Sequence, residues 1–131
     1  ITSNFLDKQI TTIPEIKTIS DFKAIEKTDF SAFSNEEFED TFDSLDCENI
    51  VIFGIETHIC VYQTVMNLLD EGCNVYVVTD CCASRSEFNH NTALELMKQE
   101  GAKIVSLEMV LFEFLKSSRH PHFKEIQTLI K

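Results

Sequence analysis

Three kinds of feature are scarce or missing in this chain. No apolar run in its 131 residues approaches the roughly 20 residues that a helix needs to cross a bilayer, so we expect a soluble protein with no membrane partner. Basic residues are few: 11 Lys and Arg stand against 22 Asp and Glu, and the formal charge of −11 argues against nucleic acid as a partner. No repeat or low-complexity segment divides the sequence, so we expect residues 1–131 to form a single domain.

The five cysteines lack the features of a disulfide framework. They stand at positions 47, 60, 73, 81 and 82, an odd number without a Cys-x-x-Cys pair, and no secretory signal peptide is visible. We therefore expect a reducing compartment, with the cytoplasm as the default location. Adjacent Cys81 and Cys82 are poor chelators of one metal ion, and His120 and His122 have no convergent third ligand. We expect no metal site.

Strands and helices alternate regularly from residue 50 onward. Apolar runs predict strands over 50–53, 75–79 and 103–106, and apolar residues at helical spacing predict helices over 58–71, 86–100 and 108–116. A last helix begins near Pro121. This order is typical of an α/β fold in which helices cover the faces of a parallel sheet.

The first 45 residues give weaker patterns. Residues 1–20 are polar and show no clear period, so we expect them to be irregular. A strand is predicted to end at Lys27, with Phe22, Ala24 and Glu26 alternating along one face. A helix is predicted over 35–45, capped by Ser34.

The most informative segment leads from a buried strand through a sharp turn to Cys60. The unpaired backbone N–H groups and positive dipole end at a helix start favour thiolate over thiol. In open parallel sheets ligands bind beyond the carboxyl ends of the strands, and the turn 54–60 lies at such an end. Cys60 is therefore a candidate nucleophile. The alternative is a small buried hydrophobic residue, a common role of free cysteine.

Three motifs and the tail together resemble a known family. The motifs are Gly-Ile-Glu-Thr-His-Ile-Cys at 54–60, Lys-Thr-Asp-Phe-Ser-Ala-Phe at 27–33 and Ser-Arg-Ser at 84–86. They are similar to the isochorismatase-like cysteine hydrolase superfamily, and the tail from His120 to Gln127 is similar to its eukaryotic isochorismatase domain-containing proteins. The resemblance implies a three-layer α/β/α sandwich with a Rossmann-like parallel sheet. It also implies a small-molecule substrate, no cofactor and a homo-oligomer.

The resemblance also assigns roles to particular residues. Hydrolytic members use an Asp, a Lys and a Cys, of which the Lys matches Lys27 and the Cys matches Cys60. A cis peptide is expected at Ile55–Glu56, where the backbone N–H groups of Glu56 and Cys60 would hold an oxyanion. Independently, an ammonium close to a thiolate stabilises it by charge attraction. From spacing alone, an ordinary surface lysine is the preferred interpretation of Lys27, and only the family resemblance reverses it.

The chain departs from the family at the catalytic Asp, which follows the first strand of other members. None of the acidic residues ahead of Lys27 follows an apolar strand, so the first two strands and their helix are expected to be missing from this N-terminally incomplete domain. The chain would then be part of a longer polypeptide, or it would complete its sheet by oligomerising. Hydrolase activity accordingly depends on an Asp supplied upstream.

Further residues narrow the expected substrate. Nicotinamidases of this superfamily bind a metal through several His, and the absence of any His before His58 argues against that activity. True isochorismate lyases have a Gly where this chain has Cys60, so the cysteine favours a covalent thioester route instead. An amide-like substrate is expected, with Phe30 and Phe33 either lining its pocket or packing in the core. His58 is interpreted as a turn residue, and Arg85 as free to contact a carboxylate or a neighbouring subunit. The competing hypothesis is a catalytically inactive binding or assembly module.

Overall fold

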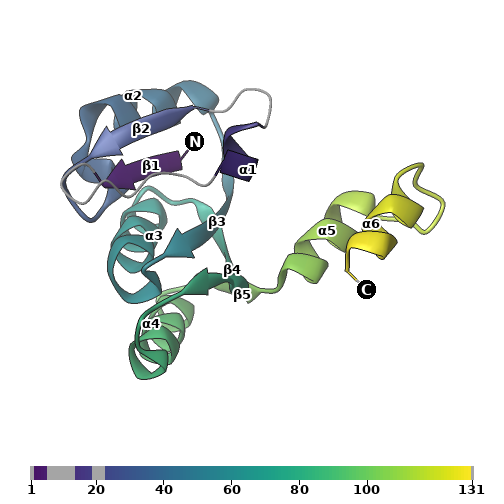
Figure 1. The fold of residues 1–131 in the computed structure, drawn as a ribbon. Coiled ribbons are helices and arrows are strands. Elements are labelled where there is room, and N and C mark those ends of the chain that lie inside the picture. Colours follow the sequence, from purple (N-terminus) through teal and green to yellow (C-terminus); the bar gives the residue numbers. More distant parts are fainter. Residues whose placement is uncertain (1, 6–13, 19–22, 131) are drawn as a thin grey trace.

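The computed structural model describes residues 2–5, 14–18 and 23–130 (Figure 1). Its strands are β1 (Thr2–Phe5), β2 (Ala24–Lys27), β3 (Asn49–Ile55), β4 (Asn74–Ala83) and β5 (Lys103–Val105). Its α-helices are α1 (Pro14–Lys17), α2 (Glu36–Leu45), α3 (Tyr62–Asp70), α4 (Glu87–Gln99), α5 (Leu107–Leu115) and α6 (Phe123–Leu129). A 3-10 turn, η2 (Ala32–Ser34), precedes α2, and a π-helical turn, η3 (Thr57–Val61), leads into α3.

The strands pair in parallel but form two separate sheets. One sheet contains β1 and β2, and the other has the order β3-β4-β5. Within the described residues the sheet is therefore interrupted between these two groups. One strand, β1, does precede the lysine-bearing β2, whereas both strands ahead of it were expected to be missing. The register of β3 and β4 shifts after Ile52, so that Gly54 pairs with Cys82. The extra residues of β4 form a bulge that contains Asp80.

The main core lies between the three-stranded sheet and the helices α3 and α4. Val65, Val75, Val77 and Met97 are completely buried there. Figure 1 shows α3 and α4 on the same side of β3 and β4, as expected when each parallel crossover is right-handed. The result is the predicted α/β architecture, with a parallel sheet flanked by helices.

The last two helices leave this body. The backbone N–H of Leu107 donates to a carboxylate oxygen of Asp80 in the β4 bulge (2.8 Å), which fixes the start of α5. From there α5 and α6 project away from α3 and α4 (Figure 1). Phe112 and Phe123 pack edge to face, with ring centroids 6.1 Å apart, and hold the two helices together. Residues 107–130 are called the C-terminal arm below.

Every helix and strand predicted beyond residue 20 is present within a few residues of its expected bounds, and Ser86 caps α4 through the N–H of Asn89. Two details near the N-terminus were wrong. The cap of α2 is Asn35, whose side chain accepts from the N–H of Phe38, whereas Ser34 ends η2. Residues 1–20 are not all irregular, because β1 and α1 lie there.

The buried face of β2 also differs from the prediction. Its inward residues are Ile25 and Lys27, whereas Ala24 and Glu26 face solvent. Phe22, the third residue of the predicted face, lies outside the described part of the chain. Because side chains alternate along a strand, a one-residue error in the assumed phase exchanges the two faces.

Candidate active site

Cys60 lies where β3 passes into α3. Gly54 has a positive φ of 141°, a conformation that glycine adopts readily. The Ile55–Glu56 peptide bond is cis, which confirms the expectation. The carbonyl of Glu56 then accepts from the N–H groups of Ile59 (3.1 Å) and Val61 (3.2 Å), so the turn is tightly wound around this carbonyl. These contacts place the partly buried Cys60 at the start of the helical segment, as the sequence predicted.

Lys27 lies at the carboxyl end of β2 and is not a surface residue, since only 5% of it is exposed. Its Nζ donates to the carbonyls of Asp29 and Phe30, both at 2.7 Å. Burial lowers the pKa of Lys27, while a hydrogen bond and charge attraction from Cys60 act in the opposite direction, as does Asp29. The structure thus brings together Lys27, at the end of β2, and Cys60, in the turn that follows β3 of the other sheet.

The segment after Lys27 is anchored to α3 by polar contacts. Ser31 donates to the side chain of Asn67 (2.7 Å), and the N–H of Ala32 donates to the hydroxyl of Thr64 (3.1 Å). The same Thr64 hydroxyl donates to the carbonyl of Cys60 (2.8 Å). One threonine therefore links the lysine-bearing segment to the cysteine-bearing turn.

The two phenylalanines predicted to line a pocket differ in environment. Phe33 packs edge to face against Phe38 and Phe42 of α2, with centroids 5.2 and 5.1 Å away, and contacts the core. Phe30 is 48% exposed, and its backbone carbonyl accepts a hydrogen bond from the ammonium of Lys27. Of the two side chains, that of Phe30 is the more exposed.

A polar cluster next to the turn was only partly foreseen. Glu56 lies with one carboxylate oxygen 3.5 Å from both His58 Nδ1 and Arg85 Nε, and His58 Nδ1 is 2.9 Å from the hydroxyl of Ser84. The contact of Arg85 with a carboxylate was expected, but the bond from His58 to Ser84 was not. Both partners of His58 approach the same ring nitrogen, so the group lacks the arrangement of a Ser-His-acid relay, which uses both nitrogens.

The described residues contain no cluster of metal ligands and no membrane-spanning helix. Across residues 2–5, 14–18 and 23–130, no three His, Cys, Asp or Glu side chains converge as metal ligands. In the same part of the chain, no helix has both the length and the apolar character required to cross a membrane. His122 is instead paired with Glu125 (2.9 Å), three residues along the exposed start of α6.

The class that the fold and the site define is a parallel α/β domain in which a buried lysine lies against a cysteine after a sharp strand-to-helix turn. The comparisons give the family: the isochorismatase domain model matches residues 8–109, and the chain belongs to this family. The chain is 41% identical over 119 residues to isochorismatase domain-containing protein 2 of Xenopus laevis. The matched region covers 91% of this chain and 58% of that protein.

A second curated relative and a solved structure are each 35% identical to the chain. The chain is 35% identical to the secreted isochorismatase effector Isc1 of Phytophthora sojae, over 100% of this chain and 65% of that protein. It is also similar to the structure of MAR1 ribonuclease from Caenorhabditis elegans, with a TM-score of 0.86 and 35% identity over 98% of this chain and 67% of the other. The chain therefore spans about three fifths of the curated relatives' length.

Proposed function

We propose that this chain carries the nucleophile and lysine of a hydrolase that acts on small amide-like substrates. The Cys60 thiolate adds to the carbonyl carbon, the carbon–nitrogen bond breaks, and the leaving nitrogen takes up a proton. Water then hydrolyses the thioester, which releases the acid and restores the thiol. No cofactor takes part in this sequence.

The observation that carries the proposal is the burial of Lys27 against Cys60. Placing an ammonium in a site with 5% exposure costs free energy, and its contact with a thiolate offsets part of that cost. A purely structural lysine would gain more by extending to solvent. The backbone N–H groups of Glu56 and Cys60 follow the cis peptide and are proposed as oxyanion donors, each worth roughly 3 kcal/mol in such sites.

Selective alkylation tests the reactive pair without knowledge of the substrate. We expect iodoacetamide at neutral pH to modify Cys60 at least about tenfold faster than a free thiol in the wild-type chain, and at an ordinary rate in Lys27→Met, because the ammonium no longer favours the thiolate. Cys47→Ser serves as the background, since Cys47 is exposed and reacts in any case. Equal rates with and without the lysine ammonium would refute the proposed pair.

A panel of small amides and carbamates then tests turnover. Release of amine that Cys60→Ser abolishes and Cys73→Ser preserves is the expected result. Cys73 is a suitable control because it is also partly buried but lies just before the amino end of β4, whereas Cys60 follows the carboxyl end of the parallel strand β3. A variant without Cys60 that retains full turnover would exclude the thioester route.

RNA is a second candidate substrate, because the similar Caenorhabditis elegans structure is named a ribonuclease. The formal charge of −11 disfavours it, since phosphate binding rests on basic groups. Incubation of a radiolabelled single-stranded RNA with wild type and Cys60→Ser distinguishes the two. If the wild type cleaves the RNA and Cys60→Ser does not, the proposed substrate becomes a phosphodiester and not an amide.

The alternative function is that of a catalytically inactive assembly module. It is favoured by the apolar surfaces that the described residues leave uncovered, including Phe53 and Phe114. An ordinary alkylation rate at Cys60 together with self-association would support this alternative. We propose the cytoplasm as the location of either form, although the Phytophthora sojae relative is named a secreted protein.

A further inference from the structure

The segment that leads from β4 into α4 contacts the turn that carries Cys60. Three pairs of side chains make this contact: Ser84 with His58, Arg85 with Glu56, and His90 with Thr57. The pair of Arg85 with Glu56 is weakened by water, because 75% of the arginine side chain is exposed. Thr57, in contrast, is completely buried, and its hydroxyl lies 2.9 Å from His90 Nδ1. The contact of His90 with Thr57 is therefore the one made deepest in the protein.

Thr57 begins the π-helical turn η3, three residues before Cys60. Its carbonyl accepts from the N–H of Tyr62, five residues further along the chain, as the carbonyl of Glu56 accepts from Val61. Turns with this spacing are rare and occur mostly as single turns at functional sites. The backbone that carries Cys60 is thus not a regular α-helix, and contacts from neighbouring elements contribute to its path.

The hydroxyl of Thr57 needs a partner inside the protein, because an unpaired buried hydroxyl costs free energy. Within the part of the chain that the structure describes, that partner is His90. A hydroxyl can both donate and accept, so the bond forms with either tautomer of the imidazole. Any shift of η3 away from α4 would break the bond and leave Thr57 unpaired. The bond therefore favours one position of the turn.

The place of His90 on α4 supports a specific role for its polar ring. Ala93 and Met97 follow it at helical spacing on the same face, and both are buried. Helix α4 packs against η3 through this face. An apolar residue would suit packing alone, whereas histidine adds a bond to the turn. On the other side, Thr64 of α3 donates to the carbonyl of Cys60, so both helices hold η3.

We propose that His90 is a positioning residue of the hydrolase site, which acts through Thr57 to hold η3 so that the Cys60 thiol stays against the ammonium of Lys27. The inference rests on the proposed function and deepens it. His90 acts on the backbone of the turn and takes no part in the bond changes at the carbonyl carbon.

Alkylation of Cys60 by iodoacetamide at neutral pH, in the Cys47→Ser background, gives the first test. We expect His90→Leu to slow it at least about threefold, a size of effect that residues in contact commonly show. His90→Asn should restore the rate to within about twofold of wild type, because its amide can replace Nδ1 as a hydrogen-bonding group. His122→Leu in the C-terminal arm is the matched control, since His122 is exposed and pairs with Glu125 three residues away.

Thr57→Val tests whether the histidine acts through the threonine. This change keeps the shape of the side chain and removes the hydroxyl. It should slow alkylation of Cys60 as His90→Leu does, and the two changes together should slow it no further. Thr92→Val is the control, because Thr92 is exposed on α4 and its hydroxyl bonds to the carbonyl of Phe88 in the same helix. Urea midpoints of all variants show that each rate belongs to folded protein.

Hydrogen exchange of the backbone reports on the turn independently of the thiol. The N–H groups of Ile59 and Val61 donate to the carbonyl of Glu56, and we expect both to exchange at least about threefold faster in His90→Leu and Thr57→Val. Exchange in β4 should stay unchanged.

Three outcomes are decisive. Unchanged exchange at the turn in both variants would overturn the proposal, whatever the reactivity of Cys60. Faster exchange with an unchanged alkylation rate would mean that the bond does not position the thiol, and the proposal would again be wrong. An ordinary alkylation rate in the wild type would refute the hydrolase proposal, and the exchange rates would still decide whether His90 holds the turn.

Discussion

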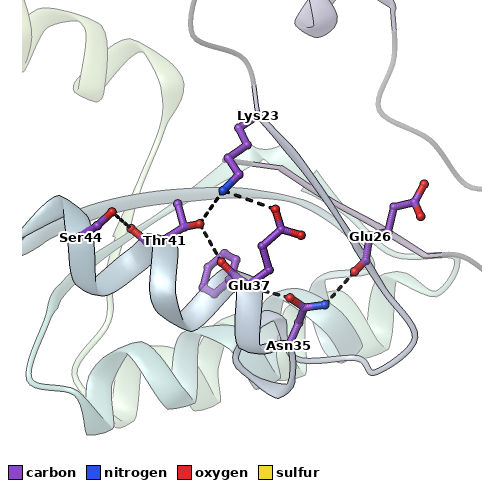
Figure 2. Close-up of polar contacts among 7 residues, drawn as sticks. Lys23, Glu26, Asn35, Glu37, Thr41 and Ser44 are labelled. Atoms are coloured by element: carbon purple, nitrogen blue, oxygen red, sulfur yellow. Dashed lines mark hydrogen bonds and ion pairs between the residues drawn. The ribbon is translucent and has the colours of Figure 1, made fainter.

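Asn35 offers a sharp test of how the lysine-bearing strand is held in place. Its side chain makes two hydrogen bonds (Figure 2): the oxygen accepts from the N–H of Phe38 (3.0 Å), and the amide nitrogen donates to the carbonyl of Glu26 (2.8 Å). The first bond caps α2, and the second joins that helix to the residue next to Lys27. Lys23 reinforces the junction through Thr41 (2.7 Å) and Glu37 (3.4 Å).

The magnitude follows from these two bonds. Loss of the cap costs about 1 kcal/mol of unfolding free energy. Loss of the second bond costs about 1 kcal/mol more, as for a typical intramolecular hydrogen bond. Asn35→Ala should therefore destabilise the chain by about 2 kcal/mol, which shifts a urea midpoint by about 1 M at a slope of about 2 kcal/mol per molar. Asn35→Ser keeps an oxygen that caps the helix and should lose only half as much.

Urea unfolding followed by circular dichroism measures both variants. Asn91→Ala is the control, because Asn91 lies exposed on α4 and its substitution should change stability by less than about 0.5 kcal/mol. If Asn35→Ser were as destabilised as Asn35→Ala, the cap would contribute nothing. If both variants matched the control, the junction between α2 and β2 would not hold the strand.

Three further predictions concern stability and reactivity. Met97→Ala should cost about 3 kcal/mol by urea unfolding, since Met97 is fully buried and leaves a cavity. Burial lowers the pKa of Lys27 from its ordinary value of 10.5, so at a pH just below 10.5 the unfolded chain still holds a proton that the folded chain has lost. The free energy of unfolding should therefore rise with pH in this range. Urea midpoints measured between about pH 8 and pH 10 should show this rise, and Lys27→Met should flatten it. Burial raises the pKa of the Cys82 thiol, so mass spectrometry should find it unalkylated at neutral pH until denaturant is added. Equal labelling of folded and unfolded Cys82 would contradict its burial.

The second half of the fold was predictable because its signals are local and repeated. Apolar runs and helical spacing located β3, β4, β5 and the helices between them. The first 45 residues allowed fewer correct predictions of secondary structure, since strands of four residues carry too few side chains to define a period. The phase of β2 depended on the sheet with β1, a contact that the local pattern does not contain.

The candidate site was predictable in its members but not in its surroundings. Cys60 followed from the strand-to-helix turn, whereas Lys27 was recognised by family resemblance, because spacing alone cannot distinguish a buried lysine from an exposed one. The bond between His58 and Ser84 joins residues 26 positions apart, and no sequence period relates them. Asp29 acts on the charge of Lys27 from two residues further along the chain, and no strand or helix period in the sequence marks the two as partners.

The anchoring of the segment after Lys27 has a consequence for how the family can diversify. Its polar bonds to Asn67 and Thr64 come from Ser31 and Ala32, so the backbone beside Lys27 is held to α3 by groups other than the side chain at position 30. The side chain at that position can therefore change in sequence while these bonds keep the lysine-bearing segment in place against the turn that carries Cys60.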